Sequence, residues 1–204
     1  MFKSVNKVIK TLVFYDLILL FGWGLVVPIV AIFIVENIKG GNAQVAGVAI
    51  GVYWLLKSAL QVPIANYLDK NHGERDDYYF LVGGTILASL TPVGFIFASL
   101  PWHIYLLQAL HALGMAAAVP AWAGIFTRHI NRGKEAQSWA LDSSAVGIGM
   151  GASGIVGGAI AEVFGFTPVF ILVGILGIIS ALLLFLIKED LSPKGKVFPM
   201  PKPQ

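Results

Sequence analysis

Residues 11–35 read TLVFYDLILLFGWGLVVPIVAIFIV, an apolar run with a single charged side chain, Asp16. As a helix rising 1.5 Å per residue, this run is long enough to cross the roughly 30 Å hydrocarbon core of a bilayer. It is too long for the apolar segment of a secretory signal, and no small-residue cleavage site follows it. The stretch therefore predicts a membrane-spanning helix that is kept in the protein.

The composition of the whole chain agrees with a membrane protein. Hydrophobic residues make up 57% and charged residues only 12% of the 204 residues, and the mean hydropathy is +0.79. Soluble domains carry about 25% charged residues, because their surfaces face water. We predict one all-α membrane domain over residues 1–190, with six transmembrane helices at about 11–35, 44–67, 79–99, 102–126, 138–162 and 167–187.

The basic residues predict the orientation of these helices. Twelve of them fall on one side of the predicted membrane, and Lys39 is the single basic residue in the opposite loops. Positive residues favour the cytoplasmic side, so both termini are expected in the cytoplasm of a cell-membrane protein, with 191–204 as a flexible, proline-containing tail. The twelve are Lys3, Lys7, Lys10, Lys70, Arg75, Arg128, Arg132, Lys134, Lys188, Lys194, Lys196 and Lys202.

An internal similarity relates the first and fourth predicted helices. Proline, alanine, phenylalanine and a following Ala-Gln pair occur in the same order within residues 28–44 and 120–137. The two helices cross the membrane in opposite directions, so the similarity predicts an inverted repeat of three plus three helices, as secondary transporters have. Chance similarity between two apolar helices is the alternative.

The loop after the second predicted helix carries a charged motif, ANYLDKNHGER at residues 65–75. It resembles the Gly-x-x-x-Asp-Arg-x-Gly-Arg-Arg signature of the major facilitator superfamily (MFS). The resemblance implies a gating loop whose charge network closes the cytoplasmic face, and an ordinary charged hairpin loop is the alternative. Ala65, Glu74 and one inserted residue depart from the signature, and the matching residues are Asp69, Lys70, Gly73 and Arg75.

Four glycines in the fifth predicted helix are spaced by four, three and four residues, so they share one helical face: Gly147, Gly151, Gly154 and Gly158. Such a stripe lets a second helix approach closely within a membrane. The segment is similar to the glycine-rich fifth helix of the MFS, although it lacks the proline of that motif. We expect the stripe to be a helix-packing surface.

The resemblance covers nearly all of this chain but only half of a usual MFS member, which has two like-oriented halves of six helices. It therefore implies a half-length transporter that works as a homodimer. In this arrangement the second helix of one copy packs against the fifth helix of the other. A heterodimer with a different half-length chain and a truncated longer chain are the alternatives.

Two charged residues lie inside predicted helices, where a charge costs a few kcal/mol and is a functional candidate by default. Asp16 is expected about 9 Å from the middle of the first helix, and Lys57 lies near the middle of the second. We predict that Asp16 is a proton-coupling group and that Lys57 is its partner or a substrate site. A structural ion pair and a snorkelling lysine are the alternatives.

Polar and aromatic side chains share faces with these charges. The resemblance implies that the first and fourth helices line a central cavity and that the second helix flanks it. We predict substrate contacts with a small polar solute, with sugars favoured and amphipathic drug-like molecules as the alternative. A non-transporting membrane scaffold is the rival function. The predicted contacts are Trp23, Trp54, Gln61, Gln108, His111 and Trp122.

Enzymatic chemistry is not expected. The chain has no cysteine, which excludes thiolate catalysis and cysteine metal sites. No histidine follows His129, so Ser153 has no later histidine to serve as a base. We therefore expect no cofactor, no metal and no nucleic-acid partner, and a protein whose partners are the bilayer, its solute and a second copy of itself.

Overall fold

The computed structural model describes residues 6–70 and 73–191, and every regular element in this part of the chain is helical. Six segments are long and apolar enough to cross a membrane, which confirms the predicted fold class. The predicted tail lies outside the described residues, except for Leu191. The elements are α1 (Lys7–Val26), α2 (Val30–Asn37), α3 (Ala43–Lys70), α4 (Arg75–Phe95), α5 (Pro101–His129), α6 (Glu135–Phe164), α7 (Phe166–Leu183) and the 3-10 helix η2 (Leu184–Ile187).

The first span is interrupted where α1 ends and α2 begins. Pro28 has no N–H group, so it cannot donate to the carbonyl one helical turn earlier. The N–H of Val27 still donates to the Trp23 carbonyl at 3.1 Å, and the N–H of Ile29 donates to the Val26 carbonyl at 2.9 Å. The chain therefore makes a tight turn at residues 27–29 before α2 continues the span.

The third span lies closer to the charged loop than the sequence predicted. The expected limits were 79–99, whereas α4 begins at Arg75 and ends at Phe95. Asp76 and Asp77 occupy its first turn, where the partial positive charge of a helix N-terminus favours carboxylates. Hydropathy alone missed this turn because its side chains are charged.

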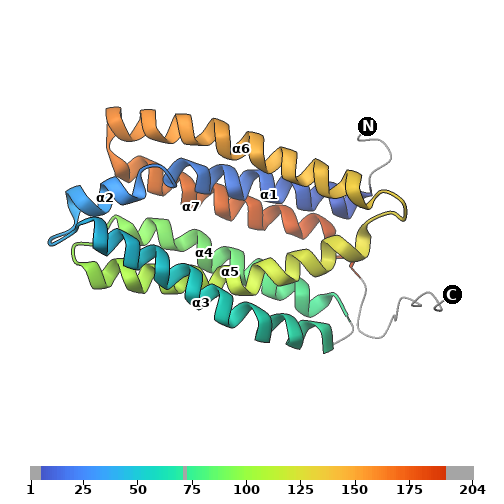
Figure 1. Cartoon of the computed structure of the whole chain (residues 1–204). Coiled ribbons are helices and arrows are strands. Elements are labelled where there is room, and N and C mark those ends of the chain that lie inside the picture. The colour runs from blue at the N-terminus through green and yellow to red at the C-terminus, as the bar shows by residue number, and fades with distance from the viewer. Residues whose placement is uncertain (1–5, 71–72, 192–204) are drawn as a thin grey trace.

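The helices form two groups of three spans (Figure 1). The first span packs against α6 and α7, the fourth span α5 packs against α3 and α4, and α4 contacts α7 between the groups. In chain order the six spans are α1–α2, α3, α4, α5, α6 and α7. If the first three spans are exchanged in order with the last three, each of these main contacts becomes another contact of the same set. The inverted repeat remains a prediction, and this packing pattern supports it.

The start of α1 and the end of η2 lie at the same end of the bundle as the α3–α4 and α5–α6 connections (Figure 1). We call this the basic end, because Lys7, Lys70, Arg75 and Arg128 are there. The Lys7 ammonium contacts the Asp190 carboxylate at 2.7 Å and so joins the first and last spans. The opposite end, which carries α2, is called the α2 end. That the basic end faces the cytoplasm remains a prediction.

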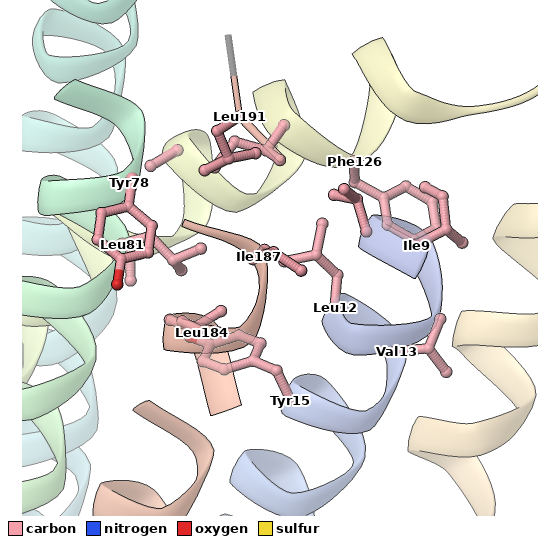
Figure 2. Close-up of a cluster of buried hydrophobic side chains, with 14 of the residues drawn as sticks. Ile9, Leu12, Val13, Tyr15, Tyr78, Leu81, Phe126, Leu184, Ile187 and Leu191 are labelled. Atoms are coloured by element: carbon pink, nitrogen blue, oxygen red, sulfur yellow. The ribbon is translucent and has the colours of Figure 1, made fainter. Parts of the chain in front are cut away.

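A cluster of buried apolar side chains fills the basic end of the bundle (Figure 2). Ile9 and Leu12 of α1 meet Leu81 of α4, Phe126 of α5 and Ile187 of η2 within this cluster. Tyr15 of the same cluster shares a hydrogen bond of 2.7 Å with the Thr85 hydroxyl group, between α1 and α4. A bond of this kind satisfies two polar groups that lipid and apolar packing would leave unpaired.

A second apolar cluster lies toward the α2 end and is centred on Phe33 of α2. The Phe33 ring meets Phe170 edge-on at 4.9 Å and Phe166 at 5.4 Å, and Phe95 of α4 lies 5.4 Å from Phe170. Edge-to-face pairs at these distances add stability beyond the burial of their area. The cluster fixes α2 against α4 and α7 beyond the interruption at Pro28.

The closest approach of α4 and α5 is a reciprocal glycine contact. A Cβ atom added to Gly84 would meet the carbonyl oxygen of Gly114 and lie 2.8 Å from the nitrogen of Ala118. One added to Gly114 would lie 2.6 Å from the carbonyl oxygen of Gly84 and 2.8 Å from the nitrogen of Ala88. The two backbones touch here because neither position carries a side chain.

We predict that Gly84→Leu destabilises the protein, because the new side chain forces α4 and α5 apart. Overpacking of this kind costs about 1–3 kcal/mol. Gly83→Leu is the matched control, since nothing lies within 4 Å of that position. Thermal unfolding of detergent-purified protein is the measurement, and an equal loss of stability in both variants would contradict the packing assignment.

Candidate functional site

A cavity of about 480 Å³ lies between α1, α3 and α5, and one residue of α6 reaches it. We call it the main cavity. Eight residues on α1, α3 and α5 were predicted as substrate or coupling residues, and six of them line this cavity. Its lining is Tyr15, Asp16, Leu19, Leu20, Trp23, Val27, Tyr53, Trp54, Lys57, His111, Met115, Ala118, Val119, Trp122 and Met150.

Three aromatic rings from three helices stack in its wall. The His111 ring of α5 lies 3.9 Å from the Trp23 ring of α1, and the two planes differ by 11°. On its other face it lies 4.5 Å from the Tyr53 ring of α3, at an angle of 22°. His111 is 8% exposed. Trp23 and His111 were predicted from the sequence, whereas Tyr53 was not, although Tyr53 is one turn from Lys57 on the same helical face.

The two charged groups predicted at the site both line the main cavity. Asp16 and Lys57 form no ion pair in the described part of the chain. The Lys57 ammonium instead lies 4.9 Å from the ring centre of Trp54 and 5.8 Å from that of Tyr53, which is within cation–π range. The coupling role of Asp16 remains a prediction.

Asp142 of α6 is a further buried acidic residue that was not predicted from the sequence, and it interacts with Asp16 but does not line the main cavity. Its side chain is 7% exposed, and its Oδ1 atom is buried without a hydrogen-bond partner. It lies within electrostatic range of Asp16. A charged residue inside the predicted 138–162 span was the signal that could have identified it.

Trp122 marks the part of the main cavity nearest the basic end. Its ring stacks on Phe126 at 4.7 Å and 19°, and the Trp139 ring of α6 lies 5.9 Å away. Its indole Nε1 atom is buried and has no hydrogen-bond partner in the structure. This arrangement leaves one buried donor unpaired next to an aromatic wall.

The two predicted glutamines differ in position. Gln108 does not line the main cavity but lines a smaller hollow of about 120 Å³ next to it. Gln61 lines neither space, and its side chain is half-buried farther along α3. Gln61 was predicted because it shares a helical face with Trp54. The main cavity, however, extends along α3 only as far as Lys57.

A charge network lies at the predicted gating loop, but its ion pairs in the described chain use residues next to the matching motif positions. The Arg128 guanidinium of α5 contacts Asp77 and also bonds to Glu74, with an Nε–Oε1 distance of 3.1 Å. The His129 Nδ1 atom lies 3.3 Å from the same Glu74 oxygen. The motif residues Asp69, Lys70 and Arg75 are exposed, and Gly73 is half-buried. Their role in gating remains a prediction.

This network ties the start of α4 to the end of α5, so we predict that Arg128→Gln lowers stability. The Glu74 and Asp77 side chains are only 3% exposed, and both pair with the Arg128 guanidinium. Removing one partner of a buried ion pair lowers the free energy of unfolding by about 3 kcal/mol. The apparent Tm should fall by roughly 5–10 °C in detergent.

The exposed loop residue Arg132 supplies the control for this experiment, and Arg132→Gln should leave the Tm unchanged. Adding Asp77→Asn to Arg128→Gln should recover part of the loss, since one unpaired carboxylate is removed. A Tm that does not change in Arg128→Gln would show that the network contributes nothing to stability.

The predicted glycine stripe on α6 is largely uncovered by the described part of the chain. Cβ atoms added to Gly147, Gly151 or Gly158 would meet nothing within 4 Å, and one added to Gly154 would lie 3.8 Å from the Gly24 carbonyl oxygen. On a different face, α6 approaches α1 closely at Gly149 and Gly157. The role of the stripe as a packing surface remains a prediction.

The structure is a bundle of six apolar helices with a partly polar cavity between its first, second and fourth spans, an arrangement that solute transporters have. The sequence comparison identifies the family, because residues 12–202 match the Major Facilitator Superfamily. The chain belongs to this superfamily, as the loop motif and the glycine-rich helix indicated. The family is one of transporters, and nothing in the site indicates catalysis.

Curated relatives include two proteins described as multidrug efflux pumps. The chain is 31% identical over 176 residues to the multi-drug resistance efflux pump PmrA of Streptococcus pneumoniae, covering 84% of this chain and 43% of the relative. It is 27% identical over 177 residues to a PmrA homolog of Lactococcus lactis, covering 85% and 42%. An uncharacterized MFS-type transporter, MJ1560 of Methanocaldococcus jannaschii, is 22% identical over 170 residues, covering 83% and 42%. The chain thus spans less than half the length of these relatives.

Proposed function

We propose that this chain forms one six-helix half of a secondary transporter that exports amphipathic, drug-like solutes by alternating access. The observation that carries the proposal is the main cavity, whose wall is mostly aromatic and aliphatic with two charged groups. The names of the PmrA relatives support the same substrate class. They favour the drug-like alternative of the sequence analysis over the sugar-like solute.

The chemistry of the cavity supports an amphipathic solute. Large apolar rings at Trp23, Tyr53, Trp54 and Trp122 suit the apolar body of a solute and need no fixed hydrogen-bond pattern. A sugar needs several convergent hydrogen-bond partners, and neither Gln61 nor Gln108 lines this space. The cavity therefore fits an apolar body with one or two polar groups better than a polyol.

Asp16 is the proposed proton-coupling group. It lies on α1 inside a membrane span, lines the main cavity and has no cationic partner within ion-pair distance in the described residues. A carboxyl group in such a place is able to carry a proton in one state of the transporter and release it in another. Asp142 lies within electrostatic range and adds to the cost of two negative charges.

We predict that Asp16→Asn abolishes accumulation of a fluorescent amphipathic dye driven by a proton gradient in proteoliposomes. Exchange of dye across the membrane should persist, because it needs the cavity but no net proton movement. The control is Glu162→Gln, an exposed acidic residue on α6 away from the cavity. A mutant that still accumulates dye would show that Asp16 is not the coupling group, and absence of flux in the unmodified protein would favour the scaffold function.

The second half of the transporter is proposed to be a second copy of this chain in the same orientation. α3 and α6 are the spans that the rest of the chain covers least. Gly47 and Gly51 of α3 have open space beside them, as the stripe on α6 does. Two copies related by a twofold axis along the membrane normal place each α3 against the α6 of the other copy.

We predict that cysteines at Leu55 and at Ile148 or Ile155 form cross-links between copies when this chain is expressed alone. These side chains are 75%, 73% and 79% exposed on α3 and α6. The chain has no native cysteine, so any disulfide-linked dimer comes from the introduced cysteines. Cysteines at Leu90 and Ile179, which are exposed on α4 and α7, are the matched control and should give no dimer band. Equal cross-linking of both pairs would contradict the proposed interface.

A further inference from the structure

The main cavity and the smaller hollow are adjacent and share part of their walls. Gln108, Ile50 and Val30 line only the smaller hollow, whereas Asp16 and Met115 line only the main cavity. The residues that line both spaces therefore stand between them. They are Trp23, Val27, Tyr53, Trp54 and His111.

The order of residues along the helices places the smaller hollow toward the α2 end. On α5, which runs from the α2 end to the basic end, Gln108 comes before His111 and Met115 comes after it. On α3, which runs in the same direction, Ile50 comes before Tyr53. The three stacked rings of Trp23, His111 and Tyr53 thus lie across the path from the α2 end into the main cavity.

We propose that these three rings, which we call the aromatic partition, form the barrier that closes the main cavity toward the α2 end. The inference rests on the proposed function, since a transporter must close its solute site to one side while opening it to the other. The partition links α1, α3 and α5, which are the three helices around the cavity. A movement of any one of them separates at least one pair of stacked faces.

The contacts are suited to a barrier that opens and closes. His111 is held by ring faces on both sides, at 3.9 Å and 4.5 Å, and no hydrogen bond to a side chain fixes it in the described structure. Two stacked pairs favour the closed arrangement by roughly five- to a hundredfold. The stacked rings close the path to a solute. Because each stacked pair is weak, a helix movement is able to separate the rings.

The absence of cysteine from the chain allows a direct accessibility test. Single cysteines at Gln108 and at Met115 place a thiol on each side of the aromatic partition. A membrane-impermeant methanethiosulfonate reagent is added to intact cells from the side of the α2 end. Lys39→Cys, in the exposed loop before α3, identifies that side and gives the rate of an open position, and Arg132→Cys marks the opposite side.

We expect Gln108→Cys to react nearly as fast as Lys39→Cys, and Met115→Cys to react at least tenfold more slowly. Adding His111→Ala should raise the Met115→Cys rate by about tenfold or more. His111→Phe, which keeps a flat ring between Trp23 and Tyr53, should keep the rate low. This variant separates ring stacking from any effect of the imidazole charge.

Trp54→Ala is the matched control, because Trp54 lines both spaces but does not stack on His111. It should leave the Met115→Cys rate low. The proposal is overturned if Met115→Cys reacts as fast as Gln108→Cys with the stack intact, if His111→Ala leaves its rate unchanged, or if Trp54→Ala raises it equally. The labelling rates do not require transport, so their outcome is independent of the outcome of the dye-flux assay.

Discussion

Close contact between helix backbones at glycine residues is the constraint on which the rest of this structure depends. Lipid provides no hydrophobic drive for helix association, so the helices are held by packing and by a few polar bonds. The Gly84–Gly114 contact sets the distance between α4 and α5, and Gly149 and Gly157 set the distance between α6 and α1. These contacts fix α4 on α5 and α6 on α1, and α1 and α5 are two of the helices that line the main cavity.

The sequence was sufficient to predict the fold class, because a bilayer restricts the possible structures to a small number. An apolar run such as residues 11–35 has to be a helix, since lipid offers its backbone no other hydrogen-bond partner. The loop at residues 65–75 and the glycines of the fifth helix then indicated the superfamily. The start of α4 was missed because Asp76 and Asp77 lower its hydropathy, while hydrogen bonding and the helix dipole still favour a helix there.

The site was predicted less completely, because cavity walls depend on contacts between helices that no single helix reveals. Asp16, Trp23 and His111 were found from polarity inside apolar runs, which is a local signal. Tyr53 was missed because a tyrosine within a span is ordinary until its neighbour across the cavity is known. The packing of the stripe beginning at Gly147 against a second copy stays a prediction, because the described α1 contacts use Gly149 on a different face of α6.

The six spans of the described chain have a consequence for how larger transporters of this kind are built. An even number of spans brings Lys7 and Asp190, near the two ends of the described helices, to the same end of the bundle. A second unit joined behind the first by a short peptide would therefore begin on the same side of the membrane and fold with the same topology. Tandem fusion of two such units needs no additional helix to reverse the direction of the chain, so covalent duplication keeps both units in the same orientation.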